Sequence, residues 1–398
     1  MSIILNKQQE FIASEAVRWY RHSSEQLFQF AGLAGTGKSV VLFEILRRLG
    51  IPLERVAPMS YIGQAAIIMR LKGLMNAKTI HSWLFNPVES YLLDNNGNIV
   101  MDTYLNKPKF KLVFEPKELD DIDIILVDEA GSVPLELRHE IMSRGKKVIA
   151  TGDLGQLPPV HGNPGFLYTG KVHYMEEIMR QKEDSGLLYL ADRARKGLPI
   201  HTGYYGDAIV IDENDLNNYM ISKSDIIICG KNATREVFNK RVRHEILNIN
   251  TDLPFINERL VCRKNNWNIE VDGINLANGL IGSVVNCPDV SGFDGKTYKI
   301  DFKPSMINSY FSDLSCDYKY LIAPHAQKQY LKNDKYSMGE KFEFAYSITT
   351  HMSQGAQFRK GIYFEEYLNK EIQNNLNYTG ITRFESSMIY VKKARKYY

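Results

Sequence analysis

Cysteine is scarce in this sequence. Only four of its 398 residues are cysteines, and no two of them have the C-x-x-C spacing of a zinc or redox pair. The pattern therefore favours neither a zinc site nor a disulfide framework. A reducing compartment such as the cytoplasm fits this usage best.

Long apolar runs and a strong charge of either sign are also missing. No run approaches the roughly eighteen residues of a membrane span, and the start MSIILNKQQE lacks a signal-peptide pattern, so we expect a cytoplasmic protein with no membrane partner. Lysine and arginine total 49 against 46 aspartates and glutamates. That balance neither requires nor excludes nucleic acid, because a basic track would have to be local.

The composition is otherwise that of a globular protein. Hydrophobic residues make up 44% of the chain and charged residues 24%, with no internal repeat or low-complexity tract. A chain of 398 residues is too long for one ordinary core. We therefore expect two or more domains.

A glycine-rich stretch predicts a phosphate-binding loop. FQFAGLAGTGKS, residues 28–39, matches the spacing G-x-x-x-x-G-K-[ST]. Its glycines would let successive N–H groups point into one hollow at a helix N-terminus, where anions are stabilised. Lys38 would reach the β- and γ-phosphates of a nucleotide, and the Ser39 hydroxyl would hold Mg²⁺. The alternative is a chance glycine turn before a helix.

The flanks of the loop support the nucleotide interpretation. Leu27–Phe30 is a strand candidate before it, and residues 40–50 follow with apolar residues at helical spacing and Gly50 as a stop. The loop residues predicted to bind ATP are Gly35, Thr36, Gly37, Lys38 and Ser39.

A helix is also expected before the loop. Asn6 is a good N-cap, and Gln9 stands three residues later, as in a capping box. Gln9 has a second interpretation, as a side chain that hydrogen-bonds the edge of a base. Both interpretations stay open on these residues alone.

Two adjacent acids end a later apolar stretch. IDIILVDEAGSV has the pattern of a buried parallel strand that finishes at Asp128 and Glu129. In open α/β sheets, ligands bind at the carboxyl ends of the strands. Adjacent carboxylates repel unless a cation lies between them, and Mg²⁺ is the natural cation here. A further strand, in KKVIATGDLGQLPPV, carries Asp153 and Gln156 at its exit.

Two segments interrupt the alternation of strands and helices. Residues 85–121 contain the turn DNNGN between strand candidates, which predicts a β-hairpin insertion with Phe110 and Phe114 as its aromatic residues. These rings either pack the hairpin onto the domain or meet a ligand. Residues 279–340 form a second β-rich insertion, in which LIGSVV, KTYKIDF and YKYLIAP are strand candidates.

In this order the motifs resemble those of superfamily 1B DNA helicases, especially the small Dda-type phage helicases and their RecD-like relatives. The resemblance covers nearly the whole chain. It rests on LNKQQ as the Q motif, GLAGTGKS as motif I, TIHSWL as motif Ib, VDEAGS as motif II, GDLGQLPPV as motif III, IMRQ as motif IV, SITTHMSQG as motif V and YTGITR as motif VI. The sequence departs from the family at APMSYIGQAA in motif Ia, at Met352, where lysine is common, and at Gln357, where an acid is common.

The resemblance implies an α/β fold of two RecA-like P-loop NTPase domains. It assigns residues 1–84 and 122–178 to the first domain and residues 85–121 to a β-hairpin insertion that acts as a pin. It assigns residues 179–278 and 341–398 to the second domain and residues 279–340 to an SH3-like β-barrel insertion.

The resemblance also implies roles for site residues. Lys38 and Ser39 would handle the phosphates and the metal, Asp128 the metal shell, and Glu129 would be the base for the attacking water. Gln156 would sense the γ-phosphate, and Gln9 would join the ATP-binding set. Arg180 and Arg383 would be arginine fingers, although a lone arginine without the resemblance is more simply a surface salt bridge.

The family likeness finally implies an ATP-dependent helicase that moves 5′ to 3′ on single-stranded DNA, with ATP and Mg²⁺ as cofactors. Partners would be single strands and forked DNA, with a single-strand-binding or replisome protein as a further partner and the monomer as the active form. The host cell would be a bacterium, infected by a phage or not. Expected DNA contacts are His81, Thr349, His351, Phe110 and Phe114. The alternatives are a RecD-like motor subunit of a nuclease complex and a non-translocating ATP-dependent clamp.

Overall fold

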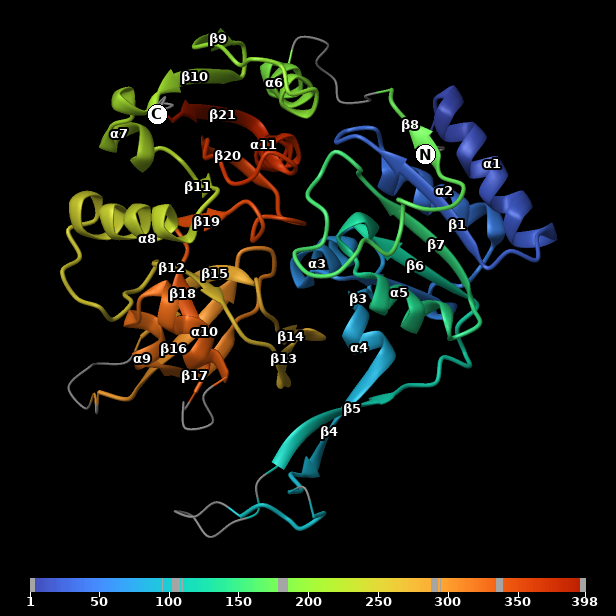
Figure 1. The fold of residues 1–398 in the computed structure, drawn as a ribbon, viewed down its shortest axis with the longest axis horizontal. Helices are drawn as coiled ribbons and strands as arrows, with labels where there is room; N and C mark the ends of the chain where they lie inside the picture. The colour runs from blue at the N-terminus through green and yellow to red at the C-terminus, as the bar shows by residue number, and fades with distance from the viewer. Residues whose placement is uncertain are drawn as a thin grey trace.

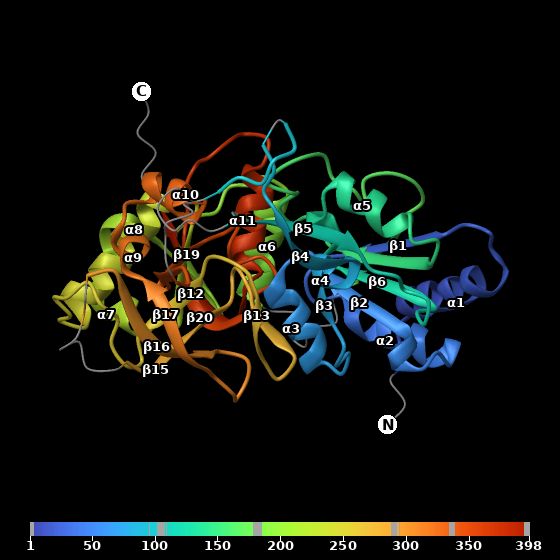
Figure 2. The ribbon, with the colours of Figure 1, turned by 90° about the horizontal axis from the view of Figure 1, so that it is seen from below.

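Two α/β domains lie side by side in the computed structural model (Figure 1), and Figure 2 shows them from below. The structure describes residues 4–94, 96–101, 108, 110–177, 185–287, 293, 295–333 and 339–393. Within these ranges no helix combines the length and the apolar character that a bilayer crossing requires. All four cysteines are free thiols.

The first domain is built on a six-stranded parallel sheet. Its strands, in spatial order, are β3 (Lys78–Thr79), β2 (Val56–Ser60), β6 (Ile124–Asp128), β7 (Lys147–Gly152), β1 (Leu27–Gly32) and β8 (His173–Met175). The middle strands are buried on both faces, which explains their continuous apolar sequences. Since β1, β6 and β7 run parallel, the glycine-rich loop leaves β1 at the same edge of the sheet at which Asp128 ends β6.

Helices cover both faces of this sheet. They are α1 (Lys7–His22), α2 (Lys38–Leu49), α3 (Gly63–Leu71), α4 (Ile80–Leu84) and α5 (Leu135–Met142), with 3₁₀ turns at Leu53–Arg55 and Ala130–Ser132. The predicted capping box of α1 is confirmed: the Asn6 side chain accepts from the Gln9 N–H at 2.8 Å, and the Gln9 side chain accepts from the Asn6 N–H at 3.0 Å. Gly50 ends α2 in the left-handed conformation, as expected of a glycine stop.

An antiparallel ribbon of β4 (Phe85–Tyr91) and β5 (Phe110–Pro116) projects from the first domain (Figure 1). It occupies the segment in which the sequence predicts a hairpin. The pairing runs without a break from Phe85 opposite Pro116 to Tyr91 opposite Phe110. Phe114 lies two residues before the end of β5, so it belongs to the base of the ribbon and not to its tip.

The second domain has a six-stranded sheet of its own. Its strands, in spatial order, are β19 (Ser347–Thr349), β11 (Ile226–Cys229), β20 (Phe358–Phe364), β21 (Phe384–Lys392), β10 (Ala208–Asp212) and β9 (Gly203–Tyr205), and only β9 pairs antiparallel. Its helices are α6 (Gly186–Arg195), α7 (Asn218–Ser222), α8 (Asn232–Arg241) and α11 (Gln373–Ile381), with a 3₁₀ turn at Glu213–Asp215 and a π-helical turn at Val242–Ile246.

A five-stranded antiparallel sheet adjoins the second domain. Its strands, in spatial order, are β17 (Phe311–Asp317), β16 (Thr297–Pro304), β15 (Ile281–Asn286), β12 (Arg259–Cys262) and β18 (Phe342–Phe344). A separate hairpin of β13 (Asn266–Val271) and β14 (Ile274–Leu276) and the helices α9 (Tyr318–Ile322) and α10 (His325–Asn333) complete this region. The sheet encloses its own apolar core, which includes Leu260, Val284 and Phe302.

One prediction about this region, the strand YKYLIAP, is wrong. The insertion is expected at 279–340, and those bounds stay a prediction; the antiparallel sheet itself also includes β12, which pairs with β15 on one side and with β18 on the other. Strands of three or four residues are too short for periodicity to reveal them. The candidate strand YKYLIAP begins as helix α9, because the Asp317 side chain accepts from the Tyr320 N–H at 2.8 Å and caps a helical turn.

Candidate nucleotide site between the two domains

The loop between β1 and α2 is tight and braced on two sides. Gly35 and Gly37 have φ angles of 85° and 83°, a region that glycine adopts without strain. The Thr36 hydroxyl donates to the Leu33 carbonyl at 2.9 Å, and the Gln9 amide donates to the Thr36 carbonyl at 3.0 Å. Gln9 thus caps α1 and holds the loop at once, while its contact with a base stays a prediction.

The start of α2 leaves room for an anion. Its N-cap is Gly37, and no side chain in the described chain caps this helix. Backbone N–H groups of a first helical turn bind anions readily when they have no cap. The Lys38 amino group donates to the Gly32 and Leu33 carbonyls at 2.8 and 3.2 Å, and the Ser39 hydroxyl accepts from Lys72 Nζ at 3.1 Å. The predicted phosphate ligand Lys38 and the predicted metal ligand Ser39 therefore lie together where the loop meets α2.

The acids at the end of β6 lie beside this loop. The Asp128 carboxylate accepts from the Glu129 N–H at 2.9 Å, and Glu129 has a left-handed φ of 51°. Burial raises the pKa of Glu129, as do the charges of Asp128 and Asp153, while Arg383 and Lys38 oppose the rise. Glu129 is therefore within electrostatic reach of Lys38, Asp128 and Arg383, three of the residues predicted to share its site.

Of the two predicted arginine fingers, only Arg383 is described; Arg180 lies outside the described residues. Arg383 is buried immediately after α11. Its Nε donates to the Thr379 carbonyl at 3.1 Å, and its Nη1 and Nη2 donate to the Ala356 carbonyl and the Thr382 hydroxyl at 3.4 and 3.3 Å. In this arrangement its guanidinium is held by its own domain.

Helix α11 reaches across to the first domain. The Tyr378 hydroxyl accepts from the Ala34 N–H at 2.9 Å and donates to Asp153 Oδ2 at 2.7 Å. The Thr379 hydroxyl accepts from the Leu157 N–H at 2.9 Å. The second domain therefore hydrogen-bonds directly to the phosphate loop and to the segment that leaves β7.

That segment, Leu154–Leu157, is held at several further points. Asn375 Nδ2 lies 3.0 to 3.3 Å from the carbonyl oxygens of residues 154, 155 and 156, and Gln354 Nε2 donates to the Leu157 carbonyl at 3.0 Å. Gln156 is buried in this contact. No sequence pattern predicted a site role for Gln354, Asn375 or Tyr378, although Gln354 and Tyr378 stand inside SITTHMSQG and YTGITR.

A cleft of about 580 Å³ opens beside these contacts. Its walls come from the loop, from β8 and from helices α6 and α11, and include Gly32, Ala34, Tyr174, Asp192 and Tyr378. The volume is in the range of small-molecule sites, and the walls come from both domains. A ligand bound here would contact both domains.

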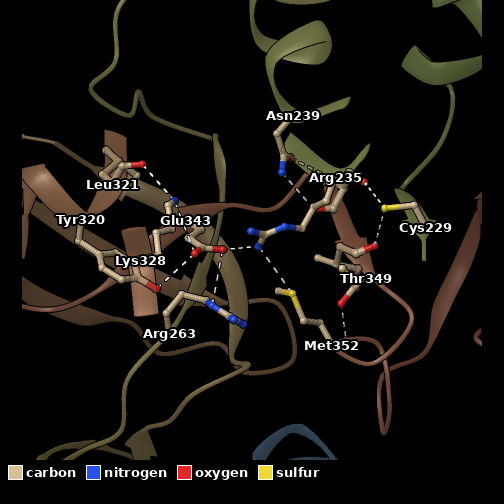
Figure 3. Close-up of polar contacts among 12 residues, drawn as sticks. Cys229, Arg235, Asn239, Arg263, Tyr320, Leu321, Lys328, Glu343, Thr349 and Met352 are labelled. Carbon is tan, nitrogen blue, oxygen red and sulfur yellow. Dashed lines mark hydrogen bonds and ion pairs between the residues drawn. The ribbon is translucent and has the colours of Figure 1, made fainter. Parts of the chain in front are cut away.

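A buried charged cluster supports the loop after β19, which carries Met352. Arg235 of α8 donates to Glu343 of β18 and, at 3.6 Å, to the Met352 sulfur (Figure 3). Arg263 Nε and Lys328 Nζ each lie 3.5 Å from the same carboxylate. Burial alone would raise the pKa of Glu343, but Lys328, Arg235 and Arg263 outweigh it and hold the pKa at about 2. The cluster ties α8, the antiparallel sheet and this loop together.

Aromatic rings gather where the ribbon leaves the first domain. The His81 ring centroid lies 6.4 Å from Tyr61, 6.1 Å from Phe85 and 6.5 Å from Phe114. Burial lowers the pKa of His81. Phe114 is 43% exposed and Tyr61 39% exposed, so both side chains are accessible to a ligand. The backbone of Phe110 pairs with Tyr91, and its side chain lies outside the described part of the structure.

The other expected DNA contacts differ in accessibility. Thr349 is buried, and its hydroxyl accepts from the Met352 N–H at 3.3 Å, so it shapes its own loop. His351 is partly exposed, and burial lowers its pKa. Of these two, His351 is the side chain that a ligand can reach.

Comparisons with known proteins agree with this fold. The family described as AAA domain matches residues 5–214. A Pif1 helicase from Bacteroides, in complex with ADP-AlF3 and single-stranded DNA, superposes with a TM-score of 0.56 at 15% identity and covers 98% of this chain and 92% of its own. Pif1 from Candida albicans gives 0.52 at 16% identity, with 98% and 94% covered.

Two curated relatives match in sequence. An uncharacterized protein of Methanocaldococcus jannaschii is 26% identical over 162 residues, which is 38% of this chain and 13% of the relative. The RecBCD enzyme subunit RecD of Buchnera aphidicola subsp. Schizaphis graminum is 22% identical over 442 residues, with 92% of this chain and 71% of the relative covered. This chain thus spans a small part of the first relative and most of the second.

These findings identify the class of protein. The match over more than half of the chain shows that it belongs to the AAA domain family. Together with its motifs and its fold, this makes it a superfamily 1B protein, a helicase-type ATPase. The predicted α/β fold of two RecA-like domains is confirmed.

Proposed function

We propose that the protein uses ATP hydrolysis to move 5′ to 3′ along single-stranded DNA and to separate duplex ahead of it. The observation that carries this proposal is the contact of α11 with the phosphate loop and with Leu154–Leu157. A nucleotide bound between the domains would favour the closed arrangement, and its hydrolysis would release it. Such differential binding is what a nucleotide-driven switch requires.

Hydrolysis in this proposal depends on groups from both domains. Lys38 and the N–H groups at the start of α2 bind the phosphates, Glu129 takes the proton of the attacking water, and Gln156 responds to the γ-phosphate. Arg383 would leave its carbonyl partners to neutralise charge that develops in the transition state. Arg180 would act as a second finger.

The residues present fit a magnesium ion. The Ser39 hydroxyl and the Asp128 carboxylate are hard oxygen donors, which Mg²⁺ prefers together with phosphate oxygens and water. No cluster of three or more His, Cys, Asp or Glu side chains in the described ranges offers a metal site without phosphates. When bound, the ion would neutralise charge on the phosphate oxygens.

The single strand would pass the open aromatic cluster of Tyr61, His81 and Phe114 and the loop that carries His351. Aromatic rings stack on bases without regard to sequence, and phosphate contacts release counterions. DNA affinity would therefore fall with rising salt and depend little on sequence. Two structures of Bacteroides Pif1 bound to single-stranded DNA support this partner.

Strand displacement with ATP on duplexes that carry a 5′ or a 3′ single-stranded tail tests the proposal. We expect the 5′-tailed duplex alone to be separated. Separation of the 3′-tailed duplex would reverse the polarity, and DNA-stimulated hydrolysis without separation would favour the clamp. Separation only in the presence of other subunits would favour the RecD-like alternative. The match to RecD, which covers 92% of this chain, supports that alternative.

The ribbon is proposed as the pin that meets the fork, with Phe114 as the stacking ring. Phe114→Ala should slow strand separation several-fold more than DNA-stimulated hydrolysis, since stacking on a base contributes about 1–3 kcal/mol. Phe11→Ala removes a similarly exposed ring from α1 and is the matched control. Equal losses of both activities in Phe114→Ala would assign the ring to packing.

A further inference from the structure

Tyr378 is the side chain of α11 that hydrogen-bonds to the phosphate loop. It is 2% exposed, and its hydroxyl bridges the Ala34 N–H and the Asp153 carboxylate, at 2.9 and 2.7 Å. Both partners belong to the first domain, whereas Tyr378 belongs to the second. One phenol oxygen therefore joins the phosphate loop, the exit of β7 and the helix that leads to Arg383.

The surroundings hold this hydroxyl in a donating state. Asp153 Oδ1 accepts from the Gly155 N–H at 2.8 Å, which leaves Oδ2 for the phenol. Burial raises the pKa of Tyr378, and the charge of Asp153 adds to this effect, so the phenol keeps its proton. The ring also fills the space beside Gly155, where a Cβ would lie 2.8 Å from the Tyr378 ring.

Other contacts of α11 hold a different segment of the first domain. Thr379 and Asn375 bind the backbone of residues 154–157, which lies beside the loop but is not part of it. Loss of the phenol would leave α11 anchored to that segment. It would, however, remove the hydrogen bond between the helix and the Ala34 N–H.

We infer that Tyr378 is a positioning residue that transmits the geometry of the phosphate loop to Arg383. This inference rests on the proposed function of the site and names a residue for the coupling between its two halves. The phenol hydroxyl can make both hydrogen bonds only when the phosphate loop, Asp153 and α11 keep these relative positions. Arg383 lies just past the C-cap of α11 and donates to the Thr379 carbonyl of that helix, so the position of α11 sets where its guanidinium can act.

Tyr378→Phe tests this role, because it removes the hydroxyl and keeps the ring. Tyr363→Phe is the matched control: Tyr363 is also fully buried, and its hydroxyl donates to Asn377 Oδ1 at 2.8 Å within the second domain. Hydrogen exchange of the peptide that contains Ala34, measured without nucleotide or DNA, should be faster in Tyr378→Phe and unchanged in Tyr363→Phe. Unchanged exchange in both would overturn the inference.

The second measurement separates kcat from nucleotide binding. We expect Tyr378→Phe to lower kcat of DNA-stimulated ATP hydrolysis by about tenfold or more, as for the loss of a hydrogen bond to a charged group, while the Kd of a fluorescent ADP changes less than about threefold. Tyr363→Phe should keep kcat within about twofold. A fall in kcat that merely follows a lower melting temperature, or equal effects of both variants, would overturn the inference. A wild-type protein without ATPase activity would instead refute the proposed function, and the exchange measurement would still decide the role of Tyr378.

Discussion

Helices α2 and α8 each follow a buried parallel strand and a glycine, and neither N-cap residue makes a side-chain cap, yet the residues just ahead of the two helices differ. At α2 the N-cap is Gly37, and the described chain offers this helix no side-chain cap. Ahead of α8, the Gly230 and Lys231 N–H groups donate to Glu366 Oε2 at 3.1 and 2.8 Å. The same order of strand, glycine and helix occurs in both domains. One anion site is open for a ligand, whereas a carboxylate of the chain occupies the other.

The difference shows how two similar domains divide the work. A helix N-terminus stabilises negative charge, whatever carries it. In the second domain Glu366 supplies that charge permanently, and Thr234 and Lys393 also bind its carboxylate. In the first domain the charge has to come from outside. Acids near the open end should therefore affect chemistry, and buried acids of the second domain should affect stability.

The largest effect should come from Glu129→Gln, at the open end. General-base catalysis contributes about 10²–10⁴-fold, so kcat should fall by that order while nucleotide affinity is kept. Steady-state hydrolysis and equilibrium nucleotide binding measure the two quantities. Glu140→Gln on α5 of the same domain, whose side chain is 48% exposed, should change neither. Near-normal turnover in Glu129→Gln would remove Glu129 from its role.

Glu343→Gln should show the opposite behaviour. It leaves Arg235 and Lys328 buried without their carboxylate, which costs about 3–5 kcal/mol in the free energy of unfolding. Chemical denaturation measures this loss. Asp313→Asn breaks the exposed Lys299 pair and should cost no more than about 1 kcal/mol. A stable Glu343→Gln variant would show that the cluster is dispensable for folding.

The same carboxylate gives a pH dependence with a definite sign. Its pKa in the folded chain is lowered from the ordinary value of 4.5 to about 2, so it stabilises the fold fully above about pH 4.5. That stability is lost as the pH falls from 4.5 towards 2. The wild type should lose stability over this window, and Glu343→Gln should lose less over the same window. Equal slopes would contradict the lowered pKa.

Glu366→Gln tests the filled helix start directly. An amide oxygen replaces a charged acceptor of two N–H groups, which should lower the free energy of unfolding by about 1–3 kcal/mol. Nucleotide affinity should not change, because the open site is in the other domain. A thermal melt and a nucleotide titration on the same preparation check both statements. Weaker nucleotide binding at unchanged stability would contradict the division of work between the two helix starts.

The sequence identifies the open helix start but not the filled one. The loop spacing, the Asn6–Gln9 cap and the acids at the end of β6 are local patterns. Such patterns can be recognised from residues close together in the sequence. Glu366 follows Gly230 by 136 residues, and Tyr378 follows Ala34 by 344, so no spacing rule connects them. YKYLIAP shows the same limit: its aromatic and branched residues favour a strand, and one capping aspartate decides for a helix.

The smallest expected effect comes from Gly37→Ala at the open helix start. Gly37 has φ of 83°, and a Cβ there would lie 2.5 Å from the Gln9 amide that holds the loop. The left-handed backbone alone costs an alanine about 1–2 kcal/mol, so nucleotide affinity should fall about tenfold if the loop shifts to relieve this strain. Gly50→Ala is the matched control, because Gly50 has φ of 68° at the other end of the same helix and a Cβ there would meet no atom within 4 Å. Both variants should lower the melting temperature, but only Gly37→Ala should weaken nucleotide binding. If both weakened it equally, helix stability and not the shape of the loop would control the anion site, and the contrast between α2 and α8 would lose its meaning for ligand binding.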